Sequence, residues 1–424
     1  MCEGNYSLAA SWLVNWDENQ ASSSSYLVDE SKDDGNGRDL MQSAFSLNYS
    51  SNSVEDLQSI MGKHRQQLDS QECNRLSVDR EQFWEDCVVF FKNPKFNPRY
   101  PLRIRFAGEA GLDTGGLRRE FGSLLVSKLF SSEAMLFEGS DDRKVPVYNA
   151  DAVHSNLFHL AGKVCAYLLS HLDLGVSCLS PVIYSYITTD EVHEASKQCT
   201  LEDIPDYDLC KFIEEVNNAS STDELQRVLD GNDQTDTLLA GGWVRVLTVE
   251  NKGSAMWQLM IHEVILKRKV ALDQFSAGLK VLVVRELLMA HSKMMEPYFV
   301  AREQTPLSAN AVLGLFEDIS QQQSDAKKEQ ARQHLIKAIT DLDVEDSKTD
   351  LQHFLHFLTG LYRIPPLGLE THLTITYKED TSKTLHLQTC AYNLNVPTVH
   401  DTYEEFQHYF ILTCRVGYVG FGLV

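Results

Sequence analysis

A cysteine near the end of the sequence has the setting that best suits nucleophilic chemistry. Cys390 follows the alternating stretch TLHLQT and precedes AYNLNVP. The thiolate is the reactive form of cysteine, and a free thiol with a pKa around 8.5 is only a few per cent thiolate at pH 7. Free cysteine is also among the most buried residue types, so the stretch alone fits either a nucleophile or a core residue.

The other cysteines show which kinds of site the sequence lacks. The chain has nine in all: Cys2, Cys73, Cys87, Cys165, Cys178, Cys199, Cys210, Cys390 and Cys414. No two of them form a Cys-x-x-Cys pair, so neither a zinc ribbon nor a thioredoxin-like motif is predicted. Cys414 ends the apolar helical stretch YFILTC, where core packing is the simpler expectation. The odd count and the lack of a secretory signal in the first residues predict reduced thiols in the cytoplasm or nucleus.

Composition and charge narrow the class of partner. The 424 residues suffice for two or three compact units, and 43% hydrophobic with 23% charged residues is ordinary for a globular protein. The formal net charge of −22 argues against a nucleic-acid binder and favours encounter with basic proteins. No apolar run reaches the length of a membrane span. We therefore expect protein partners and neither nucleic acid nor a membrane.

The elements that must position Cys390 are predicted from the periodicity of apolar residues. Residues 18–56 are rich in Ser, Asp, Asn and Gly, so an acidic disordered arm is predicted over 1–56. Helical spacing predicts helices at 78–93, 117–130, 156–172, 206–216, 255–269, 271–280, 284–299, 326–342, 350–360 and 402–414. Alternation predicts strands at 100–106, 244–250, 372–379 and 384–389. This order predicts an α+β protein, with helices dominating the first unit and a small sheet in the second.

Charged residues cluster around the glycine-rich segment GEAGLDTGG (108–116). No Lys-Ser/Thr pair follows the glycines, so a strand-to-helix turn is predicted in place of a phosphate loop. The nearby charged residues are expected to cap and pair locally: Glu109, Asp113, Arg118, Arg119 and Glu120. The basic segment 265–270 is expected to be a solvated helix face, and the polar segment 301–310 an interdomain linker.

Several segments together resemble the signature of HECT ubiquitin-ligase domains. The stretch FAGEAGLDTGGLRREFGSLL (106–125) is similar to a signature near the start of that domain, and FLHFLTGLYRIPPLGL (354–369) to a later one. The segment LQTCAYNLNVP resembles the active-site segment, with Pro397 seven residues after Cys390. ALDQFSAGL (271–279) and the terminal GFGLV also match, so the resemblance spans about 75–424 in the family's order.

The resemblance implies a bilobal HECT fold. A mainly helical N-lobe with small sheets would occupy 57–300, and a smaller α/β C-lobe would occupy 305–424. A hinge at 301–304 would join the lobes, and a surface at about 203–265 would dock a ubiquitin-conjugating enzyme. Trp243 lies in that region, where we favour core packing over contact with the enzyme.

The resemblance also implies a reaction. Ubiquitin would pass as a thioester to Cys390 and then to a lysine amine of a protein substrate. Exchange between thioesters is nearly isoenergetic, so it needs approach geometry and a thiolate, and we expect no cofactor and no metal. The residues expected to support Cys390 are Thr389, Gln388, Arg363, His400, Asp401 and Phe421. Among them, Arg363 would orient a turn or contact ubiquitin, and Phe421 would help to place the C-lobe for lysine transfer.

The active-site segment departs from the family's pattern at two places. Many members have a histidine two residues before the cysteine, where this chain has Gln388, which cannot act as a base at neutral pH. Members usually have Phe-Asn directly after the cysteine, where this chain has Ala391 and Tyr392, with Asn393 one place later. Two hypotheses therefore stand: a HECT-type ligase, or a HECT-like scaffold that binds ubiquitin or conjugating enzymes without transfer.

Two other histidines lie near Cys390 in the sequence. His386 is four extended residues away, about 13 Å at about 3.3 Å per residue, so it cannot simply replace the missing imidazole. His400 and Asp401 follow Pro397 on a segment that could fold back towards the thiol. A cysteine peptidase that pairs Cys390 with His400 is a third hypothesis, disfavoured because papain-like pairs are not spaced ten residues apart.

Overall fold

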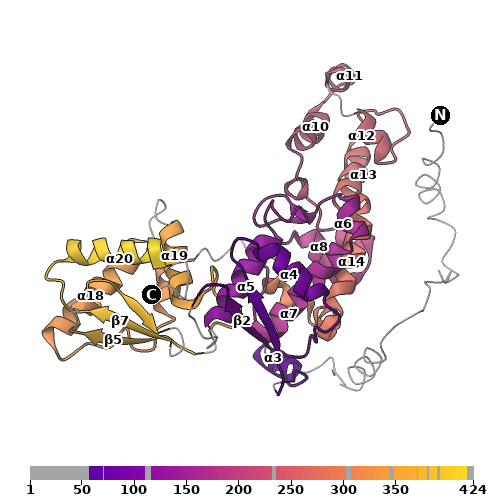
Figure 1. Ribbon diagram of the computed structural model, residues 1–424. Helices are drawn as coiled ribbons and strands as arrows, with labels where there is room; N and C mark the ends of the chain where they lie inside the picture. Colours follow the sequence, from indigo (N-terminus) through magenta and orange to yellow (C-terminus); the bar gives the residue numbers. More distant parts are fainter. Residues whose placement is uncertain are drawn as a thin grey trace.

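The computed structural model describes residues 57–69, 71–109, 116–231, 235–301, 307–342, 348–369, 371–379, 382–388 and 392–417. The predicted arm at 1–56 lies outside these residues, as do Thr389, Cys390, Phe421 and residues 302–306 of the predicted linker. The described chain forms two bodies, each around its own hydrophobic core (Figure 1). We call residues 57–301 the first body and residues 307–417 the second body.

The first body is mainly helical, as the apolar spacing predicts. Its α-helices are α3 (Leu57–Arg65), α4 (Phe83–Lys92), α5 (Gly116–Leu129), α6 (Ala150–His154), α7 (Leu157–Leu172), α8 (Pro181–Thr189), α9 (Val192–Ser196), α10 (Tyr207–Asn218), α11 (Thr222–Asp230), α12 (Thr235–Ala240), α13 (Lys252–Val264), α14 (Lys269–Leu279), α15 (Val284–Ala290) and α16 (Ser292–Met295). Helices α10, α11 and α12 project from one end of this body (Figure 1).

Helices α7 and α14 form the centre of the first core, and two glycines set how closely they pack. A Cβ atom on Gly162 of α7 would lie 2.1 Å from the carbonyl oxygen of Phe275, and one on Gly278 of α14 would lie 2.1 Å from that of His159. Contacts that short do not occur, so only glycine permits this spacing of the two helices.

Two small sheets complete the first body. Strands β1 (Asn74–Val78) and β2 (Leu102–Phe106) pair in parallel, and β3 (Phe137–Glu138) and β4 (Val145–Pro146) pair antiparallel. Residues in β1 and β2 alternate between buried and exposed, so one face of that sheet lies on the core. Strand β2 leads towards α5, and this pair of elements faces the second body in Figure 1.

The second body is a three-stranded sheet covered by helices. Its helices are α17 (Ala309–Leu313), α18 (Ala326–Asp341), α19 (Lys348–Thr359) and α20 (Tyr403–Gly417). Its strands are β5 (Thr374–Lys378), β6 (His386–Gln388) and β7 (Asn393–Pro397), in the spatial order β5-β7-β6. The central β7 runs parallel to β5 and antiparallel to β6. Gly360 ends α19 with a φ of 76°, as its place after the helical pattern predicts.

The helices and strands confirm the α+β prediction, and three local predictions were wrong. Residues 244–250 form no strand, because Val244 and Val246 are 79% and 84% exposed and no neighbouring strand pairs with them. The helix expected at 284–299 ends at Ala290, and α16 follows it as a separate short helix. The segment 265–270 is not wholly solvated, since Arg268 is 4% exposed and bonds to Glu138 and to the carbonyl of Pro146.

Candidate functional site

The described residues on each side of Cys390 form the paired ends of two strands. Gln388, the last residue of β6, is the partner of Asn393, the first residue of β7. The amide of Thr374 donates to the carbonyl of Tyr392 at 2.8 Å, and Nδ2 of Asn393 donates to Oγ1 of Thr374 at 2.9 Å. Residues 389–391 therefore connect two strand ends that the sheet holds in fixed register.

The segment after Cys390 contacts the first body. The guanidinium of Arg119, on α5, lies 4.4 Å from the ring centroid of Tyr392. Nε of the same arginine donates to the carbonyl of Thr359, at the end of α19, at 3.0 Å. The sequence predicts local pairing for Arg119, and the structure shows contacts of this side chain with two separate segments of the second body.

The segment after α19 also contacts the first body, here through a side chain of the second body. Arg363, which is exposed, donates from Nη1 to the carbonyl of Ser177 in the first body. Leu367, four residues on, packs against the first core, whereas Ile364 packs against the second. The segment that resembles the family's Arg-x-Pro stretch therefore lies between the two bodies, which agrees with a structural role for Arg363.

Buried charge lies where the first body faces this junction. Arg80 pairs with Glu109 and, at 2.8 Å, with Glu120, which is 1% exposed. The guanidinium of Arg80 also lies 4.1 Å from the ring centroid of Phe106. Arg80, which precedes α4, thus pairs with Glu109 after β2 and with Glu120 on α5. A buried carboxylate requires such a cationic partner.

Of the polar residues predicted to support Cys390, those that the structure describes do not gather at one place. Gln388 is exposed, and His400 is 5% exposed with Nε2 2.9 Å from the carbonyl of Lys383. Because Lys383 precedes β6 and His400 follows β7, this contact lies at the far end of the hairpin from Gln388 and Asn393. Asp401 is exposed beside His400, and its backbone carbonyl accepts a hydrogen bond from Gln330.

His386 is engaged within its own segment. Its Nε2 atom lies 2.8 Å from Oγ of Ser382 and 3.3 Å from Oγ1 of Thr384. The hydrogen bonds of His386 and His400 are thus made with residues 382–384, which precede β6. Thr389 and Phe421 lie outside the described residues, so their placement stays a prediction.

Most of the thiols that the structure describes are poorly suited to nucleophilic attack. Cys87, Cys165, Cys178, Cys199 and Cys414 are buried, and Cys73 and Cys210 are half-buried. Burial raises the pKa of Cys178 and Cys199 to about 12, and it also raises the pKa of Cys87, Cys165 and Cys414. The prediction that Cys414 packs in a core is confirmed, since its side chain is 0% exposed.

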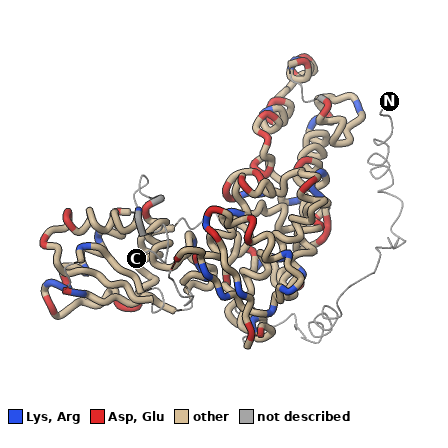
Figure 2. The backbone as a smooth tube through the Cα atoms, in the orientation of Figure 1, with Lys and Arg blue, Asp and Glu red and all other residues tan. Residues whose placement is uncertain are grey.

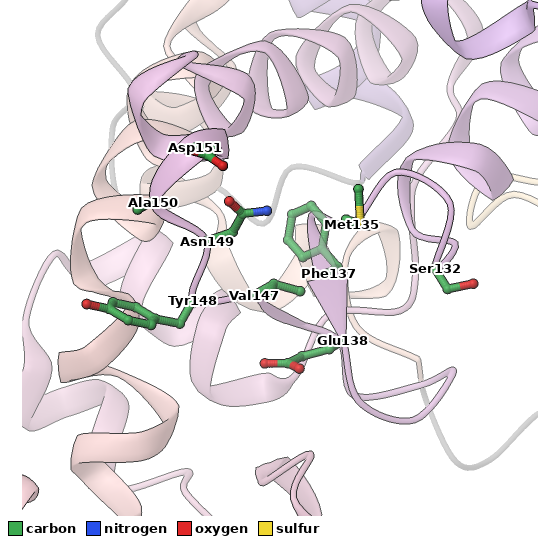
Figure 3. A pocket seen from close by; sticks show the side chains of 9 residues that line it. All are labelled: Ser132, Met135, Phe137, Glu138, Val147, Tyr148, Asn149, Ala150 and Asp151. Carbon is green, nitrogen blue, oxygen red and sulfur yellow. The ribbon is translucent and has the colours of Figure 1, made fainter.

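A hollow lies on the surface of the first body. It encloses about 470 Å³ beside β3 and the start of α6, and the ring of Phe137 faces it with Met135 nearby (Figure 3). Two of its polar side chains are already bonded: Glu138 pairs with Arg268, and Asn149 accepts a hydrogen bond from the amide of Ala152. The hollow is therefore a shallow surface feature of the fold.

The predicted docking region at 203–265 comprises α10 to α13 and the segments between them. It exposes several large apolar side chains, namely Tyr207 at 77%, Leu239 at 57%, Val244 at 79% and Val246 at 84%. Trp243 is partly buried and packs against the first core. Acidic residues colour α10 and α11 in Figure 2, and Asp208, Glu214, Asp223 and Glu224 are exposed there.

In the described part of the chain, no helix is both long and apolar enough to cross a bilayer. The same residues contain no group of three or more His, Cys, Asp or Glu side chains that could hold a metal ion.

Comparison with known proteins identifies relatives of this chain. A family model described as "HECT-domain (ubiquitin-transferase)" matches residues 123–424. The G2/M phase-specific E3 ubiquitin-protein ligase of Macaca fascicularis is 26% identical over 345 residues, which cover 80% of this chain and 46% of that protein. The protein of the same name from Gallus gallus is 26% identical over 328 residues, with 76% and 43% coverage. The probable E3 ubiquitin-protein ligase HERC4 of Rattus norvegicus is 24% identical over 321 residues, with 70% and 28% coverage. The chain spans less than half the length of each of these relatives, and because the family model matches well over half of it, it belongs to the HECT-domain family.

Proposed function

We propose that this chain is a HECT-type E3 ubiquitin ligase that accepts ubiquitin on Cys390 and transfers it to lysines of protein substrates. The observation that carries the proposal is the match of residues 123–424 to the HECT family model, because that match contains Cys390. The thiols in the described residues add support, since burial raises the pKa of most of them and leaves them poor sources of thiolate.

In this proposal the two bodies are the two lobes of a HECT domain. The first body corresponds to the N-lobe at 57–300 and the second to the C-lobe at 305–424, with a hinge at 301–304. Their separate hydrophobic cores support this division, since each body buries its own apolar residues and can move as a unit. A movable second body would let one cysteine face first the donor and then the acceptor.

The conjugating enzyme would dock on the region 203–265. Exposed apolar side chains such as Val244 and Val246 offer contact area that the isolated chain leaves uncovered. Exposed carboxylates on α10 and α11 would attract a basic face of the partner and raise the rate of encounter. Trp243 would support this surface from below, because it packs against the first core.

The chemical steps need only a thiolate and two acyl acceptors in turn. The Cys390 thiolate attacks the thioester carbonyl that joins ubiquitin to the conjugating enzyme, and the thiolate of that enzyme leaves. A substrate lysine amine then attacks the new thioester, an isopeptide bond forms, and the Cys390 thiolate leaves while the amine loses a proton. Because His386 and His400 are engaged elsewhere, we expect the lysine's proton to pass to water or to a group of the substrate complex.

A thioester trap tests the proposal. Ubiquitin, its activating enzyme and a panel of conjugating enzymes are mixed with the chain, and adducts are separated on gels with and without reductant. We expect a reducible adduct that disappears in Cys390→Ala and persists in Cys73→Ala, a control that removes a half-buried thiol of the first body. No adduct with any conjugating enzyme would refute the ligase.

The second candidate is a HECT-like scaffold without transfer, and Gln388 is the observation that favours it. Gln388 is exposed at the end of β6, where many members of the family have a histidine. The scaffold predicts that the chain binds ubiquitin or a conjugating enzyme in a pull-down while the thioester trap stays empty. Gln388→His then separates the candidates further, because a gain of adduct in that variant would show that only the imidazole is missing.

A further inference from the structure

One arginine joins the first body to two separate segments of the second. Arg119 lies in the first turns of α5 and is half-buried. Its Nε donates to the carbonyl of Thr359, and its guanidinium lies 4.4 Å from the ring centroid of Tyr392. Thr359 ends α19, and Tyr392 directly precedes β7, so a single side chain fixes a helix end and a strand start at once.

Each of these contacts has a physical reason. The last carbonyls of a helix lack partners within it and carry the negative end of its dipole, so the carbonyl of Thr359 suits a guanidinium. Gly360 turns the chain away directly after it, with a φ of 76°. The face of the Tyr392 ring is electron-rich and attracts a cation, and Thr374 holds the backbone of Tyr392 through its carbonyl.

The place of this contact matters for the proposed reaction. The second body meets the first beside α5, whereas α10, α11 and α12 project from a different end of the first body (Figure 1). A conjugating enzyme on the region 203–265 would thus sit away from the face on which Tyr392 is held. The docked position that Arg119 stabilises is therefore one that the second body must leave before Cys390 can be loaded.

We propose that Arg119 is a positioning residue that holds the second body on α5 through the ring of Tyr392 and the carbonyl of Thr359, and thereby sets how often Cys390 is free to be loaded. This inference rests on the proposed ligase function for its catalytic consequence alone. The docking itself follows from the two contacts and exists whether or not the chain transfers ubiquitin.

Hydrogen exchange measured by mass spectrometry tests the docking without any activity. Tyr392→Leu removes the ring, and we expect amides in 360–368 and in the first turns of α5 to exchange about fivefold faster, the factor that corresponds to about 1 kcal/mol of cation–π attraction. Tyr392→Phe keeps the ring face and should retain the exchange of the unmodified chain. Arg119→Gln should accelerate the same amides at least as much as Tyr392→Leu.

A double variant and a charge-matched control make this test specific. Arg119→Gln with Tyr392→Leu should exchange no faster than Arg119→Gln alone, because both changes remove the same ring contact. Arg105→Gln removes the same charge from an exposed position on β2 and should leave exchange at the junction unchanged. Equal exchange in Tyr392→Leu and Tyr392→Phe, or additive effects in the double variant, would overturn the inference.

Loading of Cys390 gives the catalytic readout. With a conjugating enzyme that forms the adduct, Tyr392→Leu should load up to about fivefold faster than Tyr392→Phe at subsaturating enzyme, in step with its exchange rate. If no variant forms an adduct, the ligase proposal fails while the exchange data still decide whether Arg119 docks the second body. If loading slows in Tyr392→Leu while exchange accelerates, the docked position is the loading position, and the inference is wrong.

Discussion

The close approach of α7 and α14 yields a sharp prediction about the stability of the first body. In Gly278→Ala the new Cβ would lie 2.1 Å from the carbonyl oxygen of His159, 2.7 Å from the amide nitrogen of Lys163 and 2.9 Å from the Cα of Gly162. All three are backbone atoms, so no side chain can rotate away to make room. The two helices must separate by about 1 Å over their contact, since Cβ contacts below 3.0 Å essentially never occur.

The expected cost follows from two opposing effects. Overpacking a core costs about 1–3 kcal/mol, and backbone obstruction puts this site at the upper end. Replacing a helical glycine with alanine returns about 1 kcal/mol through helix propensity. We therefore expect Gly278→Ala to lower the free energy of unfolding of the first body by about 2 kcal/mol.

Tryptophan fluorescence during urea unfolding measures this loss. All five tryptophans precede residue 258, so their signal does not report the second body directly. The matched control is Gly253→Ala on α13, where a Cβ would meet nothing within 4 Å and alanine should be neutral or stabilising. An unfolding midpoint of Gly278→Ala at or above that of the unmodified chain would refute the packing argument, as would equal losses in both variants.

Three further predictions concern other parts of the described chain. Burial, with Arg65 and His171 nearby, lowers the pKa of His64 from 6.5 to about 4. Because the unfolded chain takes up this proton at a higher pH than the folded chain does, the free energy of unfolding falls as the pH drops from 6.5 to about 4. Between pH 7 and pH 5 this effect should reach about 2 kcal/mol in the fluorescence assay, and His64→Gln should remove it. Arg268→Leu leaves Glu138 and the carbonyl of Pro146 without their cationic donor and should cost about 3 kcal/mol in the same assay; a loss below about 1 kcal/mol would show that water replaces it. Leu394→Ala leaves a cavity at a 0% exposed site in the central strand of the second body and should lower the free energy of unfolding of that body by about 3 kcal/mol. Hydrogen exchange of amides in β5 and β7 measures this loss. A shift of the tryptophan unfolding transition in the same variant would contradict two separate cores.

Elements with many apolar residues at one period were predictable from the sequence. The helices α7, α10 and α18 follow their expected ranges closely, because each buries a repeated apolar face. Strand β2 was found because LRIRF alternates clearly between buried and exposed residues. In these cases the local pattern and the tertiary packing agree, so the pattern is sufficient.

Elements stabilised by distant partners were not predictable in this way. Strand β7 alternates only over the four residues Asn393–Val396 and ends in a proline, and four of its five residues are buried, among them the polar Asn395. Strand β1 has few apolar residues, and its Asn74 is held by carbonyls of Asn97 and Tyr100. Conversely, 244–250 alternates without a neighbouring strand to pair with, which shows that period two predicts a strand only where a partner exists.

In the candidate site, too, local features were predictable from the sequence and long-range contacts were not. The sequence motif predicted Cys390 and its neighbours, which no pattern of burial could have done. It could not predict the role of Arg119, because its partner Thr359 is 240 residues away along the chain. A lone arginine in a charged, helical stretch carries no signal of a long-range contact, so local pairing was the natural expectation.

The segment after Cys390 meets Arg119 at a residue with an unusual backbone conformation. Asn393 pairs with both Gln388 and Thr374, which fixes the register of β7 directly after Tyr392. Tyr392 there adopts a φ of 49°, a left-handed conformation that costs a non-glycine residue about 1–2 kcal/mol. Such a conformation persists only where contacts compensate for it, and the Arg119 guanidinium supplies one. The contact with Arg119 therefore both ties the segment after Cys390 to the first body and offsets the strain at Tyr392.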